Sequence, residues 1–133
     1  MTQEDKELLL KDLCARLPYG VNVEYTFKVT VIATNAEEIM TRTLFLYSIN
    51  TLDNMTVSGI DDDGYETICF FEEVKPYLFP LSSMTEEERI AIGNEFAYGQ
   101  PQKAIDILHK RHIDYRGLIP MGLAIDATGL NIY

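Results

Sequence analysis

Two unlike halves of the chain meet at Val74-Lys75-Pro76-Tyr77-Leu78-Phe79-Pro80-Leu81-Ser82-Ser83-Met84-Thr85-Glu86-Glu87-Glu88. Pro76 and Pro80 lack a backbone N–H and push the residue before each of them out of the helical region. Large apolar side chains lie between and beside these prolines. This predicts an extended strap (residues 74–84) pinned onto a core, because a flexible tether would be polar. Thr85 with Glu88 three residues later is a capping box, so a helix is expected to begin there.

The half before the strap is expected to hold one helix and then several strands. Thr2 can cap a helix whose leucines recur at helical spacing until Pro18. Residues 21–32 alternate between apolar and polar side chains, which is typical of a half-buried strand. Further strands are expected at residues 43–49, 55–60 and 65–71, with a hairpin turn at Asp63-Gly64. Both faces of residues 43–49 are apolar, so this strand is interpreted as central or covered on both sides.

The remaining segments complete the fold prediction. Residues 33–42 allow either a short helical turn or a polar excursion, and helices are expected at residues 85–97 and from 102 to 111 or 112. A last strand is expected at residues 123–125. The fold class is α+β: an N-terminal helix, a four- to five-stranded antiparallel sheet or small SH3-like barrel, then C-terminal helices. One domain spans residues 1–133, with a β-rich lobe at about 1–73, the strap at 74–84 and a helical lobe at 85–133.

Composition restricts the classes of function. The 133 residues are 47% apolar, as in folded proteins, and their net charge of −10 repels phosphate backbones and anionic lipid. The N-terminal residues are acidic and polar, unlike a signal peptide, and no apolar run approaches membrane-spanning length. A cytoplasmic protein without a membrane partner is therefore expected. Cys14 and Cys69 lie in apolar periodic segments, so buried inert thiols are favoured over one disulfide.

A possible metal site lies near the C-terminal end of the last expected helix. His109, His112 and Asp114 form an H-x-x-H-x-D string, and two histidines three residues apart share a helix face. The alternative is that His112 is a hydrogen-bonded core histidine on the apolar stripe and that Asp114 caps the next turn. No third ligand has diagnostic spacing, so neither a metal nor another cofactor is assigned. No constellation of catalytic residues is found either.

The one basic-aromatic cluster lies in the same region. Lys110, Arg111, Tyr115 and Arg116 could contact a phosphate or an acidic partner, and they form the candidate binding site. The alternative is an ordinary surface that compensates nearby acids, as expected in a chain this acidic.

Three segments taken together resemble a known family. They are residues 8–21, the stretch 74–88 and residues 112–119. The chain resembles a family of small uncharacterised proteins encoded in gut Bacteroides genomes and their phages or mobile elements. The resemblance implies a cytoplasmic, phage-related accessory protein, and it carries over no activity, ligand or catalytic residue.

Three functional hypotheses follow. The leading one is a non-enzymatic protein–protein interaction module of phage or mobile-element origin, whose partner is another protein. An alternative is a nucleic-acid-linked small-barrel module, since small barrels often bind oligonucleotides, although the net charge opposes it. A second alternative is a metal-dependent enzyme that uses His109, His112 and Asp114.

Overall fold

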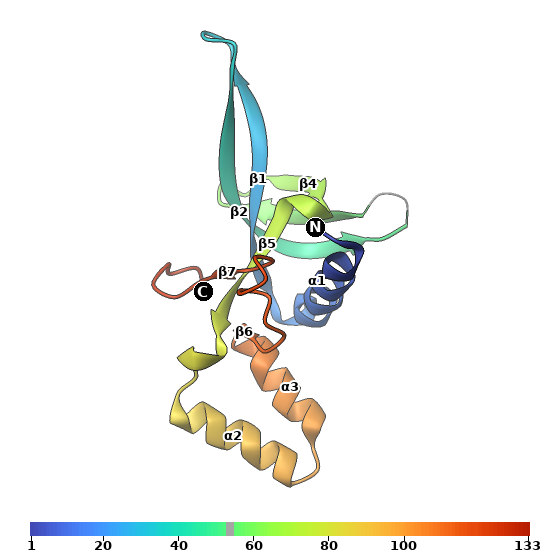
Figure 1. The fold of residues 1–133 in the computed structure, drawn as a ribbon, viewed down its shortest axis with the longest axis vertical. Helices are drawn as coiled ribbons and strands as arrows, with labels where there is room; N and C mark the ends of the chain where they lie inside the picture. The colour runs from blue at the N-terminus through green and yellow to red at the C-terminus, as the bar shows by residue number, and fades with distance from the viewer. Residues whose placement is uncertain (53–54) are drawn as a thin grey trace.

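The protein has an α+β fold, seen in a computed structural model that describes residues 1–52 and 55–133 (Figure 1). The helices are α1 (Gln3–Arg16), α2 (Glu86–Ala97) and α3 (Pro101–Lys110), with 3₁₀ turns η1 (Leu17–Tyr19), η2 (Phe71–Glu73) and η3 (Leu81–Ser83). The strands in the described residues are β1 (Val21–Val31), β2 (Ala36–Asn50), β3 (Thr56–Asp61), β4 (Glu66–Phe70), β5 (Val74–Pro80), β6 (Ile113–Asp114) and β7 (Ile125–Asp126).

The described strands form one mixed, open sheet. Their order is β4-β3-β2-β1-β5-β6, with β7 also beside β5. The strands β1 to β5 pair antiparallel, whereas β6 and β7 each pair parallel with β5. The prediction of four to five antiparallel strands is therefore corrected to seven, because the expected strap forms β5 and the two-residue strand β6 is too short to show a period. The strands β4 and β5 stand apart in the sheet order although η2 joins them directly.

The strands β1 and β2 extend beyond the other strands as a two-stranded arm, which rises above the sheet in Figure 1. The strand β1 pairs with β2 from Val21 to Val31, whereas β5 pairs with β1 only from Val23 to Tyr25. Of the two interpretations of residues 33–42, the helical turn is wrong, because a tight turn at Asn35 (φ 53°) leads directly into the first half of β2. The polar residues of this half pair with β1, so their polarity reflects an exposed arm.

The hydrophobic core lies between α1 and the inner face of the sheet. Leu9 and Leu13 of α1 are fully buried against it, as the helical spacing predicts. The other members of the core cluster are Val21, Val23, Leu44, Leu46, Val57, Cys69, Phe71, Val74, Leu78, Leu118, Leu123 and Ala124. Both cysteines are free, so the disulfide is excluded. Cys69 is buried as expected, but Cys14 is exposed, because the α1 surface that carries it is not covered by the sheet.

The strap is a strand of the sheet. Val74 and Leu78 are fully buried, which confirms that the strap is pinned onto the core. Pro76 lies opposite Val23 in β1, and β7 begins to pair with β5 only at Tyr77. The missing N–H of Pro76 can therefore face an open part of the strand edge, where proline is tolerated.

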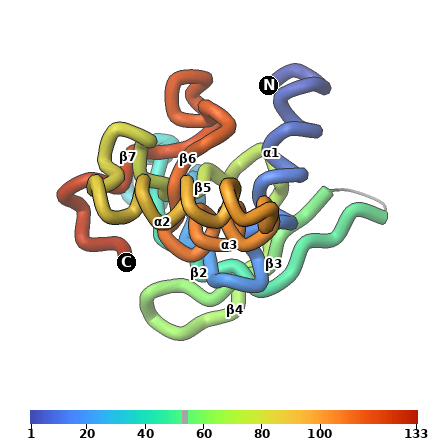
Figure 2. Tube along the Cα trace, turned by 90° about the horizontal axis from the view of Figure 1, so that it is seen from below, coloured from blue at the N-terminus to red at the C-terminus, as the bar shows by residue number. Residues whose placement is uncertain are grey.

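The two C-terminal helices form a hairpin at one end of the molecule, and Figure 2 shows them side by side. The predicted capping box is confirmed, since the Glu88 N–H donates to the Thr85 hydroxyl at 3.2 Å. The helix α3 buries Ala104 and Leu108, whereas α2 has no buried residue and packs mainly on α3. In the part of the chain that the structure describes, no helix is long and apolar enough to cross a membrane.

Candidate functional site: the outer face of the sheet

One face of β2, β3 and β4 carries large apolar side chains that point away from the core. Leu44 and Leu46 of β2 are buried, so Phe45 and Tyr47, which alternate with them, point outward. The row continues across the sheet, because Phe45 lies opposite Ile60 in β3. In β4, two exposed apolar residues flank the buried Cys69. We call this surface the outer apolar face; it comprises Phe45, Tyr47, Ile60, Ile68 and Phe70.

The outer apolar face is unusual for an antiparallel sheet. Such sheets commonly pack one face on the core and present polar residues to water on the other. Here each of the five side chains is at least 40% exposed. Large exposed apolar patches on soluble domains mark surfaces that another molecule covers.

The last residues of the chain cover the neighbouring part of this face, over β1. The Tyr133 hydroxyl accepts a hydrogen bond from the Asn22 N–H at 3.0 Å and donates one to the Tyr77 carbonyl at 2.8 Å. The Asn22 side chain donates to the Ile132 carbonyl at 3.1 Å. Burial raises the pKa of Tyr133 to about 12. A cavity of about 460 Å³ separates the last residues from the outer apolar face, with Ile132 in its lining on one side and Phe45 and Ile60 on the other.

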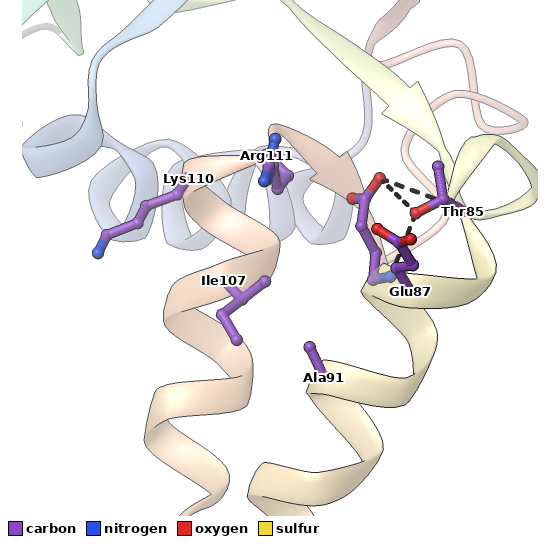
Figure 3. A pocket seen from close by; sticks show the side chains of 7 residues that line it. Thr85, Glu87, Ala91, Ile107, Lys110 and Arg111 are labelled. Atoms are coloured by element: carbon purple, nitrogen blue, oxygen red, sulfur yellow. Dashed lines mark hydrogen bonds between the residues drawn. The ribbon is translucent and has the colours of Figure 1, made fainter.

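A second concave surface lies between α2 and α3 (Figure 3). This cavity of about 550 Å³ has Ala91 and Ile107 facing each other from the two helices. Glu87 lies in the first turn of α2, and Arg111 lies just after the last turn of α3. Carboxylates stabilise a helix N-terminus and cations a C-terminus, so the helix ends explain both residue types without a ligand.

A buried ionic network joins α1 to the C-terminal half of the chain. It consists of Asp12, Arg16, His109, Tyr115 and Arg116. The Asp12 carboxylate accepts hydrogen bonds from the Arg16 Nε at 2.7 Å and the Arg116 Nε at 3.1 Å. The Tyr115 hydroxyl accepts one from the Arg116 Nη2 at 2.8 Å and lies 2.8 Å from the His109 Nε2. Asp12 and Arg16 are fully buried, so each needs the other to offset its lost hydration.

The ionic network serves the packing of the fold. The Arg16 Nη2 donates to the Ile113 carbonyl at 2.6 Å, which fixes α1 against the chain just after α3. Burial and the nearby Arg16 guanidinium lower the pKa of His109, so its imidazole is neutral near pH 7. A neutral imidazole can accept the proton of the Tyr115 hydroxyl in a hydrogen bond.

The residues of the possible metal site have separate partners. His109 belongs to the ionic network, and Asp114 accepts hydrogen bonds from the N–H groups of Leu118 and Ile119 at 2.9 and 2.8 Å, which confirms its predicted cap. His112 stacks on another ring instead. The helix α3 ends at Lys110, so His112 is not on its apolar stripe; the buried helical histidine is His109. In residues 1–52 and 55–133, no group of three or more His, Cys, Asp or Glu side chains is placed to hold a metal ion.

The residues of the basic-aromatic cluster divide between two environments. Tyr115 and Arg116 are half-buried in the ionic network, whereas Lys110 and Arg111 are exposed at the end of α3. These two cations border a cavity of about 520 Å³ together with His112 and Tyr133. The His112 ring stacks on the Tyr133 ring with centroids 3.5 Å apart, and burial with the Arg16 charge lowers the pKa of His112 to about 4.

Comparison of the chain with protein-family models, with curated protein sequences and with solved structures finds no match.

The sequence contains a signal for the outer apolar face, namely the apolar residues on both faces of residues 43–49, but it does not predict that one of these faces is exposed. Residues 43–49 are apolar on both faces, and the structure confirms the interpretation that this strand is central, since β2 lies between β1 and β3. The alternative that it is covered on both sides was wrong, because Phe45 and Tyr47 are exposed. Apolar periodicity shows which residues share a face, but not whether another element covers that face.

Proposed function

We propose that this protein is a non-enzymatic accessory protein of phage or mobile-element origin that acts by binding another protein through its outer apolar face. The observation that carries the proposal is the row of five exposed apolar side chains across β2, β3 and β4. Aromatic residues are enriched where proteins meet, and three of the five are aromatic. The origin rests on the resemblance to the Bacteroides and phage family.

The topology supports an SH3-like architecture as part of this proposal. The strand order β4-β3-β2-β1-β5, with only the 3₁₀ turn η2 between β4 and β5, suits a small, strongly bent sheet. Such folds present a rigid face and one free edge, on which a partner can be bound without rearrangement. Fold alone does not determine function, so the exposed side chains carry the argument.

Affinity capture with two matched variants tests the proposal. The tagged protein is used to capture partners from the source cells, with and without nuclease, and mass spectrometry identifies them. The test variant is Phe45→Ser with Tyr47→Ser, and the control is Ile90→Ser with Phe96→Ser on α2, where both residues are 54% exposed. We expect a discrete partner that survives nuclease, is lost with the test variant and is kept by the control. A partner kept by the test variant would overturn the assignment of this face.

A second candidate function is the nucleic-acid-linked module. The observation that favours it is the cavity in which Lys110 and Arg111 lie beside the stacked rings of His112 and Tyr133. Single strands are bound by cations combined with aromatic rings. This candidate predicts that a fluorescent oligothymidine binds more weakly as salt rises and that Lys110→Glu with Arg111→Glu abolishes binding. Binding that ignores salt, or no binding, would exclude it.

A further inference from the structure

The strand β4 leaves one edge of the sheet open. The Tyr65 carbonyl accepts a hydrogen bond from the Asp61 N–H at 3.0 Å, and the Phe71 N–H donates to the Met55 carbonyl at 2.9 Å. Backbone groups of an antiparallel strand alternate in direction, so residues 65, 67, 69 and 71 face β3. The backbone groups of Glu66, Ile68 and Phe70 therefore face away from β3, toward the edge where the sheet order ends.

This edge has few of the features that natural proteins use to block strand addition. Protected edges carry proline, lysine or a bulge. β4 has the sequence Glu-Thr-Ile-Cys-Phe, and its register with β3 is unbroken. The Phe70 N–H is occupied, because it donates to the Glu73 carboxylate at 3.2 Å. Among residues 1–52 and 55–133, none pairs with the outward backbone groups of Glu66 and Ile68, and the Ile68 side chain is 71% exposed.

A cavity of about 390 Å³ lies between this edge and the arm. Tyr25 and Phe27 of β1 form its far side, with their rings stacked 5.0 Å apart. Ile68 and Phe70 line it from β4. An extended chain added along β4 would place every second side chain toward the arm, where these aromatic rings would cover it.

The charge around this edge favours basic side chains in such a segment. Five carboxylates lie in β4 and next to its two ends: Asp62, Asp63, Glu66, Glu72 and Glu73. Arg42 pairs with Asp63 at 3.0 Å, and Lys6 pairs with Glu72. Among the described residues, no cation pairs with the other three. Glu66 shares a face of β4 with Ile68 and Phe70, whereas Asp62 and Glu73 lie beyond the two ends of the strand. Lysine or arginine side chains near the ends of an added strand would therefore be stabilised by these carboxylates.

The same carboxylates disfavour a second copy of this chain as the occupant. Antiparallel pairing of two β4 strands about Ile68 would place Glu66 opposite Phe70 of the other copy, close to that copy's Glu72 and Glu73. Like charges brought together across a strand pair are destabilising. A partner with the opposite charge suits the edge better.

We propose that the open edge of β4 binds an extended segment of a partner protein that carries both apolar and basic side chains. The inference deepens the proposed function and rests on it, since the added strand would continue the outer apolar face. The strand would exchange backbone hydrogen bonds with Glu66 and Ile68 and seat one apolar side chain beside Tyr25 and Phe27.

A designed peptide tests this inference. The probe is a capped, fluorescent ten-residue peptide of alternating valine and lysine, measured by anisotropy against the full chain. The control peptide has the same sequence with N-methyl groups on alternate residues, which keep the charge but remove backbone donors. We expect saturable binding of the probe, at least tenfold weaker binding of the control peptide, and slower exchange of the Ile68 amide in the complex.

Variants of the chain locate the site. Ile68→Pro removes the open N–H, and because that group faces away from β3 the strand can retain its ladder. Ile68→Lys is the second variant should the proline disturb folding. Ile39→Lys, at a residue 70% exposed in the arm, is the control matched in exposure and charge. Both Ile68 variants are expected to weaken probe binding at least tenfold, and the Ile39 variant by less than threefold.

Three results with the peptide would overturn the inference. They are equal binding of the N-methylated peptide, unchanged binding by a folded Ile68 variant, or no binding of the probe at all. Light scattering that shows a dimer lost with Ile68→Pro would overturn it too, because the occupant would then be a second copy. The affinity capture described above tests the proposed function separately from the peptide. If the peptide does not bind but a partner is captured through Phe45 and Tyr47, the inference about the β4 edge is wrong and the proposed function stands.

Discussion

At the scale of single residues, the buried charges are the most consequential feature of this chain. Asp12 and Arg16 stand one helical turn apart in α1 and are both removed from water. Asp12 also pairs with Arg116, so one carboxylate offsets the charge of two guanidinium groups. A buried ion pair adds little net stability as a pair, but removal of one member leaves the other uncompensated.

Asp12→Ala is therefore expected to lower the free energy of unfolding by about 3–5 kcal/mol. Urea denaturation followed by circular dichroism measures the change. Glu7→Ala, at an exposed position of the same helix, is the control and should stay within about 0.5 kcal/mol of wild type. Equal effects of the two substitutions would contradict the structural role of the ionic network.

His112 predicts a dependence of stability on pH. Its pKa in the folded state is about 4, below the ordinary value of 6.5, because burial and the Arg16 charge disfavour the imidazolium. The unfolded state therefore binds more protons between these values, and stability falls as pH drops from about 6.5 toward about 4. The slope from this one group cannot exceed about 1.4 kcal/mol per pH unit.

His112→Asn removes this titration and suits the backbone, since asparagine tolerates the positive φ of 57° at this position. Urea denaturation of both proteins at several pH values is the measurement. We expect the difference in unfolding free energy between wild type and variant to narrow as pH falls. A difference that stays constant with pH would show that His112 does not titrate in this range.

At the scale of elements, α2 is the least supported helix. Its capping box stabilises its start, but no residue of α2 is buried and its contacts are mainly with α3. Helices gain most of their stability from packing of a buried face. The helix α2 is therefore expected to open independently of the sheet.

Gly93→Ala tests this expectation. A Cβ at Gly93 would meet no atom within 4 Å beyond its two chain neighbours and the nearby backbone of its own helix, so alanine should stabilise α2 by about 0.5–1 kcal/mol. Native-state hydrogen exchange should show slower exchange in α2 with β1 and β2 unchanged. Gly59→Ala is the contrast, because its Cβ would lie 2.8 Å from the Phe45 carbonyl oxygen and should destabilise the sheet. Equal effects of Gly93→Ala on every element would contradict independent opening.

The elements whose determinants are local were predictable from sequence. Thr2, Thr85 and Asp114 each act within five residues, and all three caps were predicted correctly. The alternation that identified residues 21–32 as a strand is equally local. The strand expected at residues 123–125 shares only Ile125 with β7, and β6 was not predicted at all. Each of these strands has two residues and depends on a pairing with β5 that is distant in sequence.

At the scale of the whole molecule, the candidate site depends on what the fold leaves uncovered. The helix α1 and residues 118–124 cover the inner face of the sheet, and the last residues cover the outer face only over β1. Sequence patterns showed that Phe45 and Tyr47 share a face, but the position of every other element decides whether that face is open. The outer apolar face and the β4 edge could therefore be recognised only in three dimensions.

Site-specific photo-crosslinking is the most direct test of the central claim. Benzoyl-phenylalanine replaces Phe45 in one protein and Phe96 of α2 in another, at positions 49% and 54% exposed. After irradiation in the source cells and nuclease treatment, mass spectrometry identifies the adducts. We predict one discrete protein adduct from position 45 and none from position 96. Adducts from position 96 alone, the same adduct from both positions, or none from position 45 would contradict a partner bound on the outer apolar face.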